Sequence, residues 1–351
     1  MPPVEERPVE AADEPAPDTV IEIPSGPGTF QRREPALNDA QREIIDRLRS
    51  VGVERPRFEP GLRDHLRLEI ERGLAPLIED LGEEDLWLSK HKLEQVHGCE
   101  GKYLAEKELD FVWSAPIARG IIAHKAIEIE ITSKRRWASL DLIDEAIARF
   151  QNEGRGVGEW LQTASEADID MVRAEANNAL CSFQECWPPL KREWRPATEV
   201  AMRAEFFTGR IVLSGKPDLT IGYADGSTAG KVIVDFKTGR TAASHVADLR
   251  FYALLDALRV GVPPRMLVTY YLDSGTLQAE PVSEDILDAT VARTVAAAKR
   301  MVSLETGERE PRLVASGACR WCPALPGCSV GRNFLDEQSD AIGDPTADDD
   351  L

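Results

Sequence analysis

The chain has 351 residues, 42% of them hydrophobic and 29% charged, which is the balance of a globular protein that buries a core. Its length predicts about two domains or one elaborated domain. No stretch of about 18 apolar residues is present, which excludes a transmembrane helix, and the acidic, proline-rich start lacks the pattern of a secretory signal. We therefore expect a cytoplasmic protein without membrane contact.

The net charge of −19 is concentrated at the two ends of the chain. Residues 1–36 hold eight acidic and three basic residues, and residues 336–351 hold seven acidic residues and no basic one. Acidic segments with few aromatic residues cannot build a core, so we expect both to be disordered tails. The net acidity argues against non-specific duplex binding, but it leaves room for a local basic groove or for metal ions that join carboxylates to phosphate.

The first half of the chain between these tails has the periodicity of helices. Apolar residues recur at helical spacing in four segments, which are residues 38–81, 117–131, 138–151 and 158–185. One short segment with a cysteine occupies residues 88–110, and Pro188 and Pro189 end the helical half. We expect residues 37–87 to form a helical region ahead of the main domain.

The second half changes to the pattern of strands. Short β-branched segments are separated by turn residues at 198–207, 209–214, 218–222, 231–236, 266–272 and 276–282. The first of these should pair antiparallel. A helix is expected at about residues 243–258, and a last helix should run from Ser283, its N-cap, to Leu304. This order predicts an α/β fold with a mixed β-sheet core and a helical flank.

The most informative stretch is residues 215–240, which contains two aspartates and a lysine. Asp235 and Lys237 share one face of a strand, and a hairpin can place Asp218 beside them. Carboxylates are ligands for Mg²⁺ or Mn²⁺, and a lysine can steady an attacking water or a phosphate. A surface ion pair on a hairpin would use the same residues, but the apolar residues 232–234 favour a functional reason for an acid at the end of this strand.

A second group of candidate ligands consists of cysteines. Cys319 and Cys322 form a C-x₂-C pair, Cys328 follows after five residues, and Cys99 lies far upstream. A C-x₂-C pair in a reducing compartment indicates a metal site rather than a disulfide. The spacing alone leaves zinc and an iron–sulfur cluster open.

Together these motifs resemble the PD-(D/E)XK nuclease superfamily in its RecB-like branch, over roughly residues 88–332. In that branch the lysine strand commonly ends in a DxKTG pattern, which residues 235–239 match as DFKTG. The resemblance implies a restriction-endonuclease-like mixed β-sheet core flanked by helices. The nuclease domain would then span residues 88–335, with the N-terminal helical region before it.

The resemblance also implies roles for individual residues. Asp218, Asp235 and the carbonyl of Phe236 would hold Mg²⁺ or Mn²⁺. His124, at the end of the sequence GIIAH, matches a histidine that is a further metal ligand in the family. Lys237 would position water or stabilise the transition state.

On the helix after the lysine strand, family members carry a Q-x-x-x-Y motif. Here Asp248 and Tyr252 hold its two positions. Tyr252 is therefore expected to support the catalytic site. Asp248 departs from the pattern, so the contact made by the family's glutamine does not carry over.

The cysteine spacing resembles AddB-type and CRISPR-associated RecB-like nucleases. These proteins bind a [4Fe–4S] cluster with one cysteine before the nuclease core and three after it, spaced C-x₂-C-x₅-C. Cys99, Cys319, Cys322 and Cys328 have this arrangement. The resemblance implies an iron–sulfur clip that joins distant parts of the chain, with zinc as the less favoured alternative.

The function implied is that of a metal-dependent DNA nuclease, and more narrowly of an exonuclease acting on single-stranded DNA ends. DNA repair, recombination, phage replication and defence are compatible roles, with a helicase or a repair or defence protein as partner. The alternative is a non-catalytic DNA-binding or scaffold subunit, which Asp248 favours and the complete set of Asp218, Asp235 and Lys237 opposes. Residues 134–137 (KRRW) would contact a single strand, or form a solvated loop with a packed tryptophan.

Overall fold

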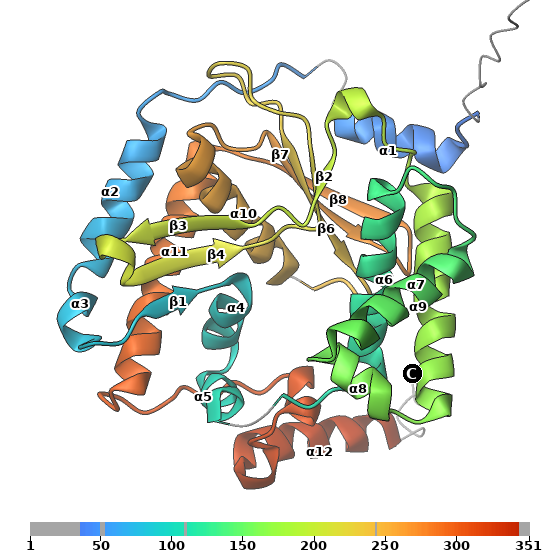
Figure 1. Ribbon diagram of the computed structural model, residues 1–351. Coiled ribbons are helices and arrows are strands. Elements are labelled where there is room, and N and C mark those ends of the chain that lie inside the picture. Colours follow the sequence, from blue (N-terminus) through green and yellow to red (C-terminus); the bar gives the residue numbers. More distant parts are fainter. Residues whose placement is uncertain (1–35, 50–52, 109–110, 243, 344–351) are drawn as a thin grey trace, which may run out of the picture. The chain divides into compact units, whose positions relative to one another are not determined.

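The computed structural model describes residues 36–49, 53–108, 111–242 and 244–343. It divides the chain into two units, Met1–Ala36 and Leu37–Leu351, and the fold described below is that of the second unit (Figure 1). The predicted N-terminal tail, apart from Ala36, lies outside the described residues. Among the helices that are described, none is long and apolar enough to cross a membrane.

Two β-sheets lie at the centre of this unit. The larger has the strand order β2 (Ala197–Thr198), β5 (Leu219–Ile221), β6 (Val232–Lys237), β7 (Met266–Tyr271) and β8 (Thr276–Pro281). Only β6 and β7 are parallel in it, and the other neighbours are antiparallel. The smaller sheet has the order β1 (Leu86–Leu88), β4 (Ile211–Gly215) and β3 (Met202–Phe206). The mixed α/β fold predicted from the sequence is confirmed.

The parallel pair needs a crossover connection, which α10 (Ser244–Val260) supplies between β6 and β7. A second long helix, α11 (Glu284–Glu305), packs against α10. Its predicted N-cap is confirmed, because the Ser283 hydroxyl accepts a hydrogen bond from the backbone N–H of Ile286 at 3.3 Å.

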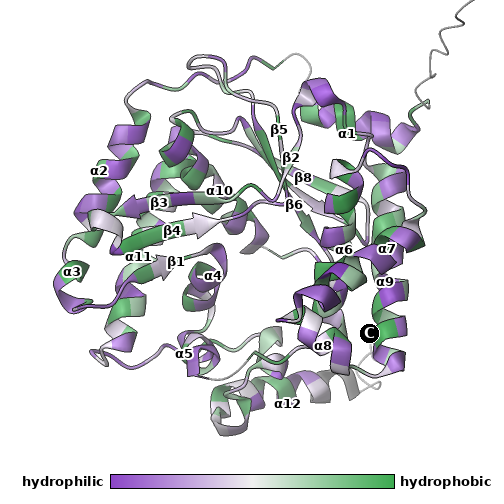
Figure 2. Ribbon diagram, in the orientation of Figure 1, coloured by the Kyte–Doolittle hydropathy of each residue, from purple (hydrophilic) through white to green (hydrophobic). Residues whose placement is uncertain are grey.

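Hydrophobic clusters cover both faces of the larger sheet, and the alternation of β6 decides which side chain enters which cluster. Ile233 packs with α10, α11 and α2 (Leu62–Leu74) in what we term the α10 core. Val232, Val234 and Phe236 pack in the α6 core, with helices α1 (Asp39–Arg49), α6 (Ala115–Thr132), α7 (Ser139–Glu153) and α9 (Glu166–Cys186). In Figure 2 the central strands are largely hydrophobic, while the helices around them carry hydrophilic and hydrophobic sides.

Two predicted segments are each divided into two helices. Residues 158–185 form α8 (Val157–Thr163) and α9, because Ala164 and Ser165 are extended and the Ser165 hydroxyl caps α9 through the N–H of Asp168. Residues 88–110 contain α4 (Lys90–Gly98) and α5 (Glu100–Glu108), which are separated by the extended residue Cys99. Within residues 38–81 a short helix, α3 (Leu77–Asp80), follows α2.

The C-terminal prediction needs a correction. Helix α12 (Ser329–Gly343) continues past residue 336, where the sequence predicted a disordered tail. It packs against two 3₁₀ turns, η3 (Gly317–Trp321) and η4 (Leu325–Gly327), while Asp336 and Glu337 remain on its surface, where acidic side chains are solvated. Residues 344–351 lie outside the described part. The domain boundary after residue 87 stays a prediction, although α2 packs against α10 and α11.

Helix α8 packs unusually close to the backbone of α7, and Gly158 makes this approach possible. A Cβ at Gly158 would lie 1.9 Å from the carbonyl oxygen of Phe150. We expect Gly158→Ala to lower the free energy of unfolding by about 1–3 kcal/mol or more, because a backbone atom must move. Gly98→Ala is the matched control, since no atom lies within 4 Å of its Cβ position. Urea unfolding of both variants checks the prediction, and equal midpoints would contradict it.

Candidate active site

The hairpin of β5 and β6 brings the first two predicted residues together. Its register pairs Leu219 with Val234, so Asp218, one residue before β5, lies opposite Asp235. The Asp218 carboxylate accepts a hydrogen bond of 2.6 Å from the backbone N–H of Phe236. This contact holds Asp218 at the open end of the central strand, as the sequence predicted for a hairpin.

Asp235 and Lys237 project from the same face of β6. The ammonium Nζ of Lys237 lies 2.7 Å from Oδ2 of Asp235, and only 1% of Asp235 is exposed. The pair is close enough for a strong ion pair, but Oδ2 has no hydrogen bond of good geometry. A buried carboxylate oxygen whose charge is neutralised without a directed donor can still accept another ligand.

His124 reaches the same place from the opposite core. It lies in the middle of α6, with Nδ1 3.2 Å from Oδ1 of Asp218. Burial would lower the pKa of His124, but the neighbouring carboxylates of Asp218 and Asp235 outweigh burial and raise it. The site therefore joins one side chain from α6 with three from the hairpin of β5 and β6, namely Asp218, Asp235 and Lys237.

A further residue of the site, Lys90, was missed by sequence reasoning. It is the first residue of α4, and its Nζ lies 2.9 Å from Oδ1 of Asp235, so that Asp235 lies between two ammonium groups. Burial alone would raise the pKa of Asp235, but Lys90 and Lys237 together hold it below its ordinary value. Asp235 likewise raises the pKa of Lys90 against the effect of burial. No signal in the sequence separates Lys90 from other helical lysines.

Helix α10 supplies Asp248 and Tyr252. Oδ2 of Asp248 lies 3.3 Å from the ammonium of Lys237, and burial raises the pKa of Asp248 although Lys237 opposes it. The hydroxyl of Tyr252 donates a hydrogen bond to the carbonyl of Lys216 at 3.1 Å, and its ring centre lies 5.0 Å from the ammonium of Lys90. Tyr252 thus braces both the segment before Asp218 and the second lysine.

The donors at this end of the sheet suit a hard divalent cation. Asp218 and Asp235 offer carboxylate oxygens and Phe236 a backbone carbonyl, which are the ligands that Mg²⁺ and Mn²⁺ prefer. His124 adds a ring nitrogen, a softer donor, beside Asp218. Within the described ranges, no three His, Cys, Asp or Glu side chains stand close enough together to form a finished metal site. At Asp235, both carboxylate oxygens face an ammonium group instead.

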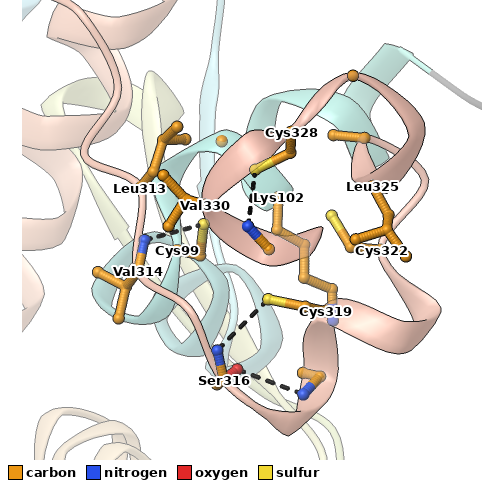
Figure 3. Close-up of a pocket in the computed structure, with 15 residues that line it drawn as sticks. Cys99, Lys102, Leu313, Val314, Ser316, Cys319, Cys322, Leu325, Cys328 and Val330 are labelled. Carbon is orange, nitrogen blue, oxygen red and sulfur yellow. Dashed lines mark hydrogen bonds between the residues drawn. The ribbon is translucent and has the colours of Figure 1, made fainter. Parts of the chain in front are cut away.

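The four predicted cysteines line a single cavity of about 310 Å³, as Figure 3 shows. Three of their sulfurs accept backbone hydrogen bonds: Cys99 from Val314 N at 3.5 Å, Cys319 from Ser316 N at 3.3 Å and Cys328 from Gly331 N at 3.4 Å. Amide donors directed at sulfur stabilise thiolates and tune metal–sulfur groups. The structure thus places cysteines that are 220 residues apart in sequence around one cavity, although among the described residues no three of them stand close enough to form a finished metal site.

A buried ion pair holds the two sides of the cysteine cavity together. Glu100, directly after Cys99, accepts two hydrogen bonds of 2.8 Å from the guanidinium of Arg309 and one of 2.7 Å from the N–H of Arg312. These hydrogen bonds, first of all those from Arg309, lower the pKa of Glu100 to about 2. Sequence reasoning missed this pair, because it joins residues more than 200 positions apart.

Other predicted contacts to nucleic acid are engaged within the protein. The Trp137 ring lies 4.4 Å below the guanidinium of Arg135, and its indole N–H donates to the Ser133 hydroxyl. Of the two alternatives predicted for residues 134–137, these contacts favour a loop with a packed tryptophan over a surface that is free to stack on a base.

Comparison with known families now bears on this geometry. The model of the PD-(D/E)XK nuclease superfamily matches residues 88–329, more than half of the chain. The chain belongs to the PD-(D/E)XK nuclease superfamily. The match covers the hairpin with Asp218 and Asp235, and it includes all four cysteines of the cavity. Nucleases of this superfamily typically use divalent metal ions.

Solved structures show similarity at low sequence identity. One is described as "Putative exonuclease" from Eubacterium rectale, with 12% identity, a TM-score of 0.41, and coverage of 74% of this chain and 91% of that one. Another is the protein SSO0001, with 16% identity, a TM-score of 0.32, and coverage of 75% and 95%. A search of curated proteins finds no significant match.

The Glu100 ion pair gives a prediction about stability. We expect Glu100→Gln to lower the free energy of unfolding by about 1–3 kcal/mol, because it removes a charge-assisted pair from a buried position. The depressed pKa means that the wild-type contribution is fully present above the ordinary glutamate pKa of 4.5 and is lost as the pH falls toward 2.

Chemical denaturation at pH 7 and at intervals below pH 5 measures both effects. Glu108→Gln is the matched control, because Glu108 is exposed at the end of the same helix. If the two variants lose stability equally, or if the difference between Glu100→Gln and wild type persists unchanged at the lowest pH, the ion pair does not hold the cavity together.

Proposed function

We propose that the chain is a metal-dependent deoxyribonuclease whose site lies at the end of β6. The supporting observation is the meeting of Asp218, Asp235 and Lys237 at one end of the sheet, with His124 beside them. Asp218, Asp235, His124 and the Phe236 carbonyl would hold Mg²⁺ or Mn²⁺. The bound metal would activate water and stabilise charge on the phosphate.

The side chains around this group have separate tasks. The ammonium of Lys237 would hold the attacking water or stabilise negative charge on the phosphate in the transition state. Asp248 keeps that ammonium in place from the side of α10. Tyr252 would support the site through its hydrogen bond to the carbonyl of Lys216, two residues before Asp218.

We also propose that the cysteine cavity holds a [4Fe–4S] cluster bound by Cys99, Cys319, Cys322 and Cys328. The support is the shared cavity and the three amide hydrogen bonds to sulfur. Such a cluster would have a structural role, because it closes a loop of more than 200 residues around the nuclease core. Zinc is the alternative occupant.

The proposed substrate is single-stranded DNA, degraded from an end in repair, recombination, phage replication or defence. A helicase or another repair or defence protein is the proposed partner, and the cytoplasm the proposed compartment. The competing function is a DNA-binding or scaffold subunit without catalysis. Substitution of Lys237 distinguishes the nuclease from the non-catalytic subunit.

A cleavage assay tests the nuclease. Anaerobically purified protein is incubated with Mg²⁺ or Mn²⁺ and single-stranded DNA labelled at either end. We expect Lys237→Ala to lower the cleavage rate by about 10²–10³-fold, because it removes transition-state stabilisation. Lys299→Ala, at an exposed position of α11, should cleave like wild type. Absence of cleavage by wild type would favour the scaffold subunit, and equal cleavage by Lys237→Ala would show that the cleavage does not come from the site at the end of β6.

Metal and sulfide analysis tests the cluster. Anaerobic wild-type protein should contain iron and acid-labile sulfide, with broad visible absorbance. Cys322→Ser should lose most of both, because it removes a cavity ligand, whereas Cys181→Ser should keep them, since Cys181 is an exposed cysteine of α9. Stoichiometric zinc without sulfide in the wild-type protein would replace the cluster proposal with a zinc site.

A further inference from the structure

The proposed mechanism assigns no role to Lys90, a partly buried lysine of the site. Lys90 reaches Asp235 from α4, 145 residues away in sequence, and its side chain is 28% exposed, compared with 17% for Lys237. Of the two ammonium groups, that of Lys90 therefore has the freer access to solvent. A buried lysine beside a carboxylate already paired with another lysine is costly to keep as a structural element alone.

The charges around Lys90 indicate what it would contact. The described site holds two lysines and three aspartates, namely Lys90, Lys237, Asp218, Asp235 and Asp248. Glu94 and Arg293, which line the small pocket beside Lys90, are of opposite charge and leave the net charge of this set unchanged. Addition of a divalent cation would change this set from one excess negative charge to one excess positive charge. An anionic group of a ligand, such as a phosphodiester, restores neutrality at this low-dielectric position.

Local structure keeps Lys90 in position to meet such a group. Ser89 is extended and caps α4 through the N–H of Lys92, so Lys90 begins the helix, where unpaired amides add positive potential. The ring of Tyr252 lies beside the ammonium, with 5.0 Å from Nζ to the ring centre. Asp248, on α10, lines the same small pocket as Lys90, and its Oδ2 lies 3.3 Å from the ammonium of Lys237.

We infer that Lys90 is a second phosphate-binding lysine of the active site, and that Asp248 is the counter-ion that keeps the lysine pair in place. The inference rests on the proposed function and deepens it by naming a substrate contact. It also gives a physical reason for the aspartate at position 248, where the resembling family carries glutamine. A site with two lysine ammonium groups needs one more carboxylate to reach the same net charge as a site with one lysine.

The alternative is that Lys90 only neutralises the buried Asp235. Both roles predict lower stability when the charge of Lys90 is removed. Only the phosphate contact predicts a change in the salt dependence of DNA binding, because each phosphate contact releases counterions from the strand. The salt dependence is therefore the measurement that separates the two roles.

The test uses a fluorescein-labelled 20-nucleotide single-stranded DNA and the full chain in Ca²⁺, with fluorescence anisotropy at several salt concentrations. We expect Lys90→Met to weaken binding about 5- to 10-fold at low salt and to reduce the slope of log Kd against log salt by about 0.7. Lys92→Met is the matched control on the same helix, because Lys92 faces Glu305 and Lys107 instead of the site. Lys90→Arg should keep the wild-type slope.

Thermal unfolding checks that the variants are folded, and Lys90→Gln, whose amide can still donate to Asp235, replaces Lys90→Met if the latter does not fold. An unchanged slope in a folded, uncharged Lys90 variant would overturn the inference, and so would a wild-type chain that does not bind the oligonucleotide. Binding that depends on Lys90, in a chain that cleaves no DNA, would support the phosphate contact and reject the nuclease. Cleavage that depends on Lys237, together with DNA binding that does not change in the Lys90 variants, would support the nuclease and reject the phosphate contact of Lys90.

Discussion

The burial of Asp235 at the end of the central strand is the constraint on which the site depends. A carboxylate that is 1% exposed stays ionised only if positive groups surround it, and two lysines from different elements do so. Lys237 comes from the same strand, but Lys90 comes from α4. The placement of α4 against α10 and α11 is thus tied to the charge of one strand residue.

The register of the larger sheet divides the site between the two hydrophobic cores. Asp235 follows Ile233 on the α10 side, where Lys90 and Asp248 approach it. Phe236 points into the α6 core, and α6 carries His124 to Asp218 at the neighbouring strand. A slip of one residue in β6 would exchange these faces, placing Phe236 among the lysines and Asp235 among aromatic rings.

Most of the correct predictions came from patterns between residues that are close in sequence. The hairpin spacing located Asp218 beside Asp235, the two-residue spacing located Lys237, and the serine before α11 located a helix start. Lys90 and Glu100 could not be predicted in the same way. The partner of Lys90 is 145 residues away in sequence, and the partner of Glu100 is more than 200 residues away. A single lysine or glutamate on a helix has no sequence pattern that indicates burial. The break at Cys99 was missed for a related reason, since the extended residue is fixed by the cavity it faces.

Helix α4 has one end in each of the two centres of the protein. It starts at Lys90, beside Asp235, and the residue that follows its last turn is Cys99. Nine helical residues span only about 14 Å and transmit displacement as a rigid rod. The cysteine cavity and the end of the central strand are therefore joined by one short helix, and a shift of Cys99 along the helix axis would also shift Lys90.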